Sequence, residues 1–171
     1  MQKGTIGKAE QSTSLPAQVL QKLGGEQLEA YAADAICLST VGEEGWPHTA
    51  QLSVGEVLAI SETELLVAIW PASHTSKSLR RDGRLTLCLA ADGALINIRA
   101  TATLAEEHQT SLDLAVFRIH VDAVKEDRAA YADVISGITF RLHDREETFA
   151  RWREQIKTLK QLAELAPNAD Q

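Results

Sequence analysis

The sequence predicts a mainly β protein, an antiparallel barrel of six or seven strands with short helices before it and a long helix after it. Short runs of apolar or alternating residues recur between residues 35 and 142. Turns of hairpin length, such as Asp92-Gly93, separate most of these runs. Parallel strands would need crossover connections between them, so this spacing favours antiparallel pairing over a βαβ sheet.

The composition is typical of a soluble globular chain, and it limits the classes of partner. The 171 residues are 44% hydrophobic and carry a formal net charge of −7, with no block of Lys and Arg. An acidic chain without a basic patch is a poor ligand for nucleic acid. We find no apolar run of membrane-spanning length and no secretory signal, and therefore expect a cytoplasmic protein with no membrane partner.

Both cysteines lie inside strand-like runs. Cys37 falls in the run 35–41 and Cys88 in the run 84–90. In a cytosolic protein this placement predicts two buried free thiols more readily than a disulfide. No Cys/His spacing suggests a zinc site, and we expect no bound metal.

The chain divides into three parts. Residues 1–13 are polar and without pattern, and we expect a flexible arm. Residues 14–143 are expected to hold the barrel with its N-terminal helices, and residues 144–167 a helix packed on the same domain. The first helix begins at Ser14-Leu15-Pro16 and stops at Gly24-Gly25, and good helix formers predict a second one over Glu26–Ala33.

The predicted strands are short. They are residues 35–41, 49–54, 65–70, 84–90, 94–104, 117–122 and 137–142, and the short apolar run 58–60 precedes the turn at residues 61–63. The run 49–54 alternates most clearly: Thr49, Gln51 and Ser53 form its polar face. Such a face normally meets solvent. Because it carries no charge, it would also suit a polar ligand or a subunit interface.

The stretch from Trp70 to Gly83 has the composition of an anion site. It follows an apolar strand and contains Ser73, Thr75, Ser76 and Lys77 before the helix-stop signal Asp82-Gly83. A helix that starts near Ser73 or Thr75 would direct free backbone N–H groups and its positive dipole end at a phosphate. The simpler interpretation is an ordinary helix cap with a solvated lysine.

The C-terminal segment has a helical pattern. Asp144 and Glu147 have the spacing of a capping box. Apolar side chains then recur at three- and four-residue steps, which is typical of one helix face. These are Phe149, Trp152, Ile156, Leu159 and Ala163. The helix is expected to end near Ala166-Pro167, and its apolar face to cover either its own barrel or a partner.

The order of these elements resembles the pyridoxamine 5'-phosphate oxidase-like family of FMN-binding split barrels. The resemblance spans roughly residues 26–142. It rests on a turn with Gly45-Trp46-Pro47, a strand from His48 to Val54, a strand ending at Trp70, and Ser76-Lys77 followed by residues 79–85, LRRDGRL. It implies a split β-barrel that forms a homodimer with FMN at the interface.

The resemblance also implies roles for individual residues. Ser73, Thr75, Ser76 and Lys77 fall where the family holds the flavin phosphate. Thr49, Gln51 and Ser53 fall where it lines the flavin ring and ribityl chain, and Trp70 would lie against the flavin or close the barrel end. Many family oxidases carry an arginine on the strand that here has Ala50-Gln51-Leu52. The phosphate would then depend on Lys77, the hydroxyls and Arg80 or Arg99.

Several functions fit these residues. The first is an FMN-dependent oxidoreductase acting on a small molecule, reduced by NAD(P)H or another donor. The second is a non-catalytic flavin carrier, and the third a split barrel that binds haem or a deazaflavin. A fourth, a true pyridoxamine 5'-phosphate oxidase, would use Arg141 and His143, since residues 141–145 resemble a substrate-binding string of those enzymes. A flavin itself carries the electron chemistry, so no catalytic residue is predicted.

Overall fold

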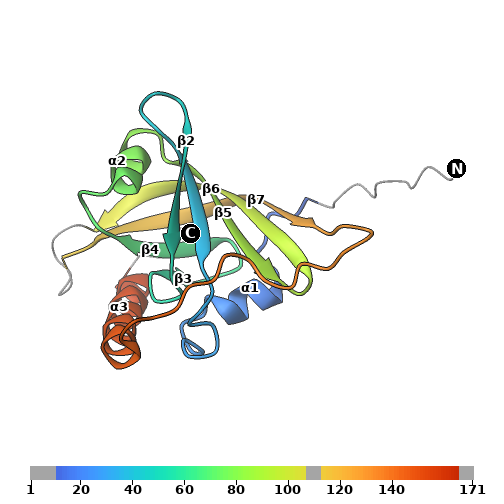
Figure 1. The fold of residues 1–171 in the computed structure, drawn as a ribbon. Coiled ribbons are helices and arrows are strands. Elements are labelled where there is room, and N and C mark those ends of the chain that lie inside the picture. Colours follow the sequence, from blue (N-terminus) through green and yellow to red (C-terminus); the bar gives the residue numbers. More distant parts are fainter. Residues whose placement is uncertain (1–10, 107–112, 166–171) are drawn as a thin grey trace, which may run out of the picture.

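The computed structural model describes residues 11–106 and 113–165, which form one curled antiparallel sheet with three helices around it (Figure 1). The helices are α1 (Ala17–Lys22), α2 (His74–Arg81) and α3 (Arg145–Leu165). The strands are β1 (Ile36–Val41), β2 (Pro47–Leu52), β3 (Val57–Ala59), β4 (Glu64–Ile69), β5 (Arg84–Ala91), β6 (Ala94–Glu106) and β7 (Ala115–Asp127).

The sheet has the order β2-β1-β5-β6-β7-β4-β3, and every neighbouring pair is antiparallel. Within the described residues its two end strands, β2 and β3, are not paired with each other. The sheet therefore curls into a split barrel rather than a closed one. The predicted fold class, mainly antiparallel β with short helices and a long C-terminal helix, is confirmed.

The core lies on the inner face of this sheet. Leu38, Leu87, Ile98 and Val124 are register partners across four adjacent strands, and all four are buried. Burying one such side chain contributes roughly 1.5–3 kcal/mol. Because side chains alternate along a strand, the same register turns Ser39, Thr86 and Arg99 to the opposite, open face.

Helix α3 packs against β3 and β4, beneath the sheet in Figure 1. Phe149, Trp152, Ile156 and Leu159 of the predicted apolar face are buried, and Ala163 is half-buried. Asp144 caps the helix, because its Oδ1 accepts the backbone N–H of Glu147 at 2.9 Å. The predicted helix end at Ala166-Pro167 lies outside the described residues.

Two predicted elements are wrong. Residues 26–33 form turns instead of a helix, because Leu28 and Ala32 are buried while Glu26 and Glu29 bind Lys160 and Arg153 of α3. These long-range contacts override the local helix propensity.

Residues 137–142 are extended but form no strand. Both edges of β1 are already paired, so only the short stretch before it is available. Ala35 donates to Ile138 O at 3.0 Å, Phe140 donates to Ala33 O at 2.9 Å, and Thr139 forms a single bridge with Asp34.

The predicted N-terminal arm, residues 1–13, lies largely outside the described residues. Of the three that are described, Ser12 forms a bridge with Val124 of β7. Its backbone N–H donates to Val124 O at 3.1 Å, and its carbonyl accepts the N–H of Val124 at 2.6 Å. This end of the arm is therefore attached to the sheet.

Candidate functional site

The N-terminus of α2 is the centre of the candidate site. Ser73 caps the helix: its Oγ accepts the N–H of Ser76 at 3.1 Å, and its carbonyl accepts the N–H of Lys77 at 3.1 Å. The helix ends before Asp82, where Gly83 adopts a positive φ of 78°. The start and stop predicted from the sequence are both confirmed, because both depend on local cap chemistry.

Two backbone N–H groups at this end are left over. Among the described residues, those of His74 and Thr75 have no acceptor. Free N–H groups at a helix N-terminus, together with the positive dipole end, attract anions. The side chain of Lys77 is exposed and forms no ion pair with a described residue.

The hydroxyls of the predicted site are partly occupied. Ser73 Oγ is the cap acceptor, and Ser76 is fully buried with its Oγ 3.4 Å from Arg80 Nε. Thr75 is buried as well. The structure brings Ser73, Thr75, Ser76 and Lys77 together as predicted, but Ser73 Oγ and Ser76 Oγ already have partners inside the helix, so the clearest groups for a ligand are Lys77 and the backbone.

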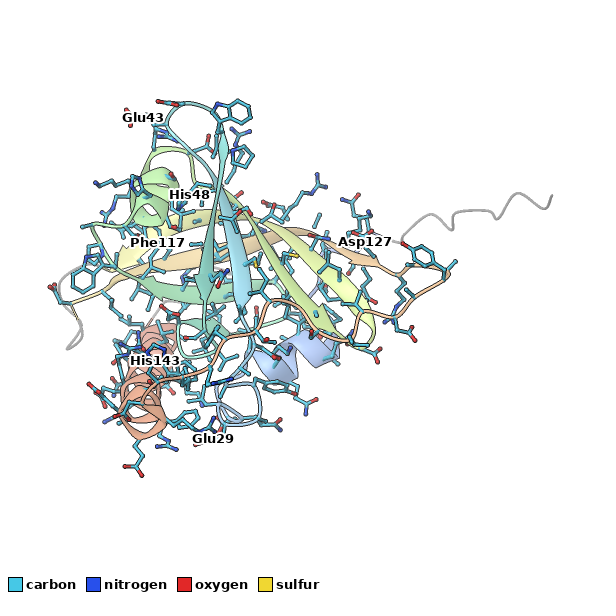
Figure 2. All side chains as sticks on the ribbon, in the orientation of Figure 1. Glu29, Glu43, His48, Phe117, Asp127 and His143 are labelled. Carbon is cyan, nitrogen blue, oxygen red and sulfur yellow. The ribbon has the colours of Figure 1, made fainter. Side chains whose placement is uncertain are left out.

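Two imidazoles border the same helix end. His48 on β2 and His74 on α2 are both exposed, and their ring centroids are 5.7 Å apart. Figure 2 shows His48 beside α2. The contact between α2 and β2 is long-range, and no spacing in the sequence reveals it.

Strand β2 carries the second part of the predicted site, and it is an edge strand of the sheet. Thr49 and Gln51 are exposed on its open face, and Thr49 Oγ1 lies 2.8 Å from Ser39 Oγ. Ser53 does not join them. The strand ends at Leu52, and Ser53 is buried with its N–H and Oγ 2.7 Å and 2.8 Å from Glu56 Oε2.

The remaining candidate residues are separated. Trp70 lies just after β4, near the start of α2, with 64% of its surface exposed. Arg141 and His143 are exposed in the segment that leads into α3. Figure 2 shows His143 at the α3 end of the molecule, away from His48. The structure does not bring Arg141 and His143 to the α2 terminus.

A cavity of about 490 Å³ lies on the open side of β1, β5 and β6. A β-bulge lies in its wall: Asp122 of β7 is the extra residue opposite Arg99 and Ala100 of β6, and its carboxylate accepts the hydroxyl of Thr101 at 2.8 Å. Arg99 therefore lines this cavity rather than the α2 terminus. Alternation of Arg84, Thr86 and Cys88 along the fifth strand could have indicated this polar surface from the sequence.

One acid near the end of α2 has a strongly shifted pKa. The Arg84 guanidinium donates to both carboxylate oxygens of Asp82, at 2.7 and 2.8 Å. These bonds lower the pKa of Asp82 from 3.8 to about 2. The contact fixes the turn between α2 and β5.

The described residues contain no group of three or more His, Cys, Asp or Glu that could hold a metal ion. None of their helices is long and apolar enough to cross a membrane.

The chain is similar in sequence to a known bacterial protein. No family profile matches the chain. The uncharacterized protein YclD of Bacillus subtilis (strain 168) is 33% identical over 144 residues, which are 84% of this chain and 94% of YclD.

Solved structures with this fold were also found. A candidate pyridoxamine 5'-phosphate oxidase from Lactobacillus delbrueckii superposes with a TM-score of 0.50 at 18% identity, over 66% of this chain and 94% of that one. An FMN-binding protein from Syntrophomonas wolfei gives 0.47 at 15% identity, over 65% and 88%. The chain thus belongs to the same family as YclD, and its fold is the split barrel of pyridoxamine 5'-phosphate oxidase-like proteins.

Proposed function

We propose that this protein is an FMN-binding flavoprotein, a homodimeric oxidoreductase that acts on a small molecule. The observation that carries the proposal is the capped N-terminus of α2, where the N–H groups of His74 and Thr75 and the ammonium of Lys77 are free of described partners. Together they present donors and positive charge to a phosphate.

The flavin phosphate is assigned to this helix end. Lys77 supplies the charge, and the two backbone N–H groups supply directed hydrogen bonds. The imidazoles of His48 and His74 border the site and add donors when protonated. Because β2 carries no arginine, the proposal assigns the phosphate charge to Lys77 and the N-terminus of α2.

The flavin ring is assigned to the edge of β2. An edge strand has backbone N–H and C=O groups without strand partners, which suits the polar rim of an isoalloxazine. Gln51 is exposed beside that edge, and Trp70 supplies an exposed aromatic surface. When bound, FMN supplies the electron transfer. The residues of this chain hold the phosphate, orient the ring and exclude water from one side of it.

A homodimer would complete the site. Trp46, Tyr131 and Ile135 are large apolar side chains, and they are 75%, 93% and 95% exposed. Apolar side chains as exposed as these are candidates for contact with another protein surface. Trp46 lies in the β1–β2 hairpin, next to the strand assigned to the ring. A second subunit seated there would cover Trp46 and the exposed side of the flavin, whereas Tyr131 and Ile135 lie in the segment between β7 and α3.

The test begins with the absorption spectrum and the mass in solution of the freshly purified protein. We expect a flavin spectrum, or uptake of added FMN, on a dimer. Reduction of the bound flavin by NAD(P)H would separate an oxidoreductase from a flavin carrier. A haem spectrum, or a protein that takes up no FMN, would overturn the proposal.

A further inference from the structure

The two cysteines occupy directly opposite positions on neighbouring strands. Cys37 of β1 and Cys88 of β5 are register partners. Opposite residues of an antiparallel pair have Cα atoms about 4.5 or about 5.5 Å apart. Both separations fall within the range of about 4.4–6.8 Å that a disulfide accepts. No local pattern reveals this pairing, because 50 residues lie between the two cysteines.

The two side chains also share a face. Opposite residues point to the same side of a sheet, and this side is the open one, away from the core row of Leu38 and Leu87. Both thiols are free and half-buried, whereas the sequence predicted buried ones. Their neighbours in the same row are Gln51 on β2 and Asn97 on β6.

We propose that Cys37 and Cys88 form a thiol–disulfide modification site, at which exchange with a small disulfide such as oxidised glutathione creates an intrachain bond between β1 and β5. One cysteine thiolate attacks the small disulfide, forms a mixed disulfide and releases one thiol. The second thiolate then attacks the mixed disulfide and releases the other. Two cysteine thiols lose two electrons and two protons in total, and one small disulfide becomes two thiols.

The surroundings set the pH dependence of this exchange. Burial raises the pKa of the Cys88 thiol, and the proximity of Cys37 and Asp127 raises it further. The other groups in this row are Gln51 and Asn97, which do not titrate, and Lys125, which pairs with Asp127. A raised thiol pKa keeps Cys88 protonated at neutral pH. Formation of the disulfide is therefore slow at neutral pH and becomes faster as the pH increases.

The bond is expected to be readily reversible. Opposite side chains have Cβ atoms about 4.5–5.5 Å apart, whereas a disulfide needs about 3.5–4.5 Å. The two strands must approach each other by roughly 1 Å, and a strained disulfide is easily reduced. Because β1 separates β5 from β2, this adjustment lies one strand from the edge assigned to the flavin. The site itself depends on no cofactor.

The test uses the full-length protein, reduced, freed of cofactor and incubated with oxidised glutathione at neutral and at alkaline pH. Intact mass and a non-reducing peptide map report the product. We expect the loss of two hydrogen atoms, a peptide that links Cys37 to Cys88, faster formation at alkaline pH and full reversal by dithiothreitol. The single variants Cys37→Ser and Cys88→Ser are expected to stop at one added glutathione.

Three outcomes would overturn the proposal. The first is stable addition of glutathione to both thiols of the native protein. The second is a bond between two chains instead of within one. The third is a native protein that stays reduced while the urea-denatured chain is oxidised under the same conditions. None of these results depends on FMN, so this inference and the proposed function can fail separately.

Discussion

Gly55 and Trp152 are in such close contact that a Cβ atom on Gly55 would lie 2.1 Å from Cγ of the indole. Trp152 is only 2% exposed. Gly55 lies between β2 and β3, and Trp152 lies on α3. The absence of a side chain at Gly55 therefore allows the long helix to dock against the sheet.

Gly55→Ala is expected to destabilise the protein, because the added methyl group must displace a buried indole or the helix that carries it. Overpacking a well-packed core costs about 1–3 kcal/mol, occasionally more. Urea denaturation followed by far-UV circular dichroism measures the change.

Gly137→Ala is the matched control. Its added Cβ would have no neighbour closer than 3.7 Å, and its φ is not positive. The free energy of unfolding of this variant is expected to stay within about 0.5 kcal/mol of wild type. Equal losses in the two variants would contradict the docking role of Gly55.

The Asp82–Arg84 contact predicts a pH-dependent stability difference. The pKa of Asp82 is lowered from 3.8 to about 2 in the folded state, first by the hydrogen bonds from Arg84. A lowered pKa means that the carboxylate stabilises the folded state fully above pH 3.8, and that this contribution is lost as the pH falls towards about 2.

Asp82→Asn removes this contribution. Urea midpoints of wild type and variant are expected to differ at neutral pH, and the gap is expected to close as the pH falls to about 2. A gap that does not change with pH would show that the carboxylate charge plays no part.

Asp144 predicts a capping effect on α3. Its Oδ1 accepts the N–H of Glu147 at 2.9 Å. Asp144→Ala removes that acceptor and is expected to cost about 1 kcal/mol of stability, whereas Asp144→Asn keeps an acceptor and should cost much less. Thermal and urea unfolding of the two variants side by side check this, and equal losses would mean that the negative charge, not the cap, is what matters.

Local signals made much of this fold predictable from the sequence. Ser73 and Asp82-Gly83 set the ends of α2, and Asp144 sets the start of α3, because a cap depends on residues within one turn. Alternation along the strands identified the sheet in the same way.

What the sequence could not predict depends on contacts between distant segments. Residues 26–33 have helix propensity, yet they form turns, with Leu28 and Ala32 buried in the core and Glu26 and Glu29 paired with α3. Ser53 continues the alternation of β2 in the sequence, yet its N–H and Oγ donate to Glu56 and it does not join the polar face of the strand. The approach of His48 to His74 and the pairing of Cys37 with Cys88 follow from packing and sheet register, which have no short-range signature.

If the α2 terminus holds the FMN phosphate through Lys77, loss of this lysine must lower the affinity for FMN, which calorimetric titration of cofactor-free protein measures. Lys77→Ala is expected to weaken binding by about 1.5–3 kcal/mol, or about 10- to 150-fold. The control Lys157→Ala removes an exposed lysine of α3 and should leave the affinity unchanged. Unchanged FMN affinity in Lys77→Ala, or equal losses of affinity in both variants, would show that Lys77 does not hold the FMN phosphate.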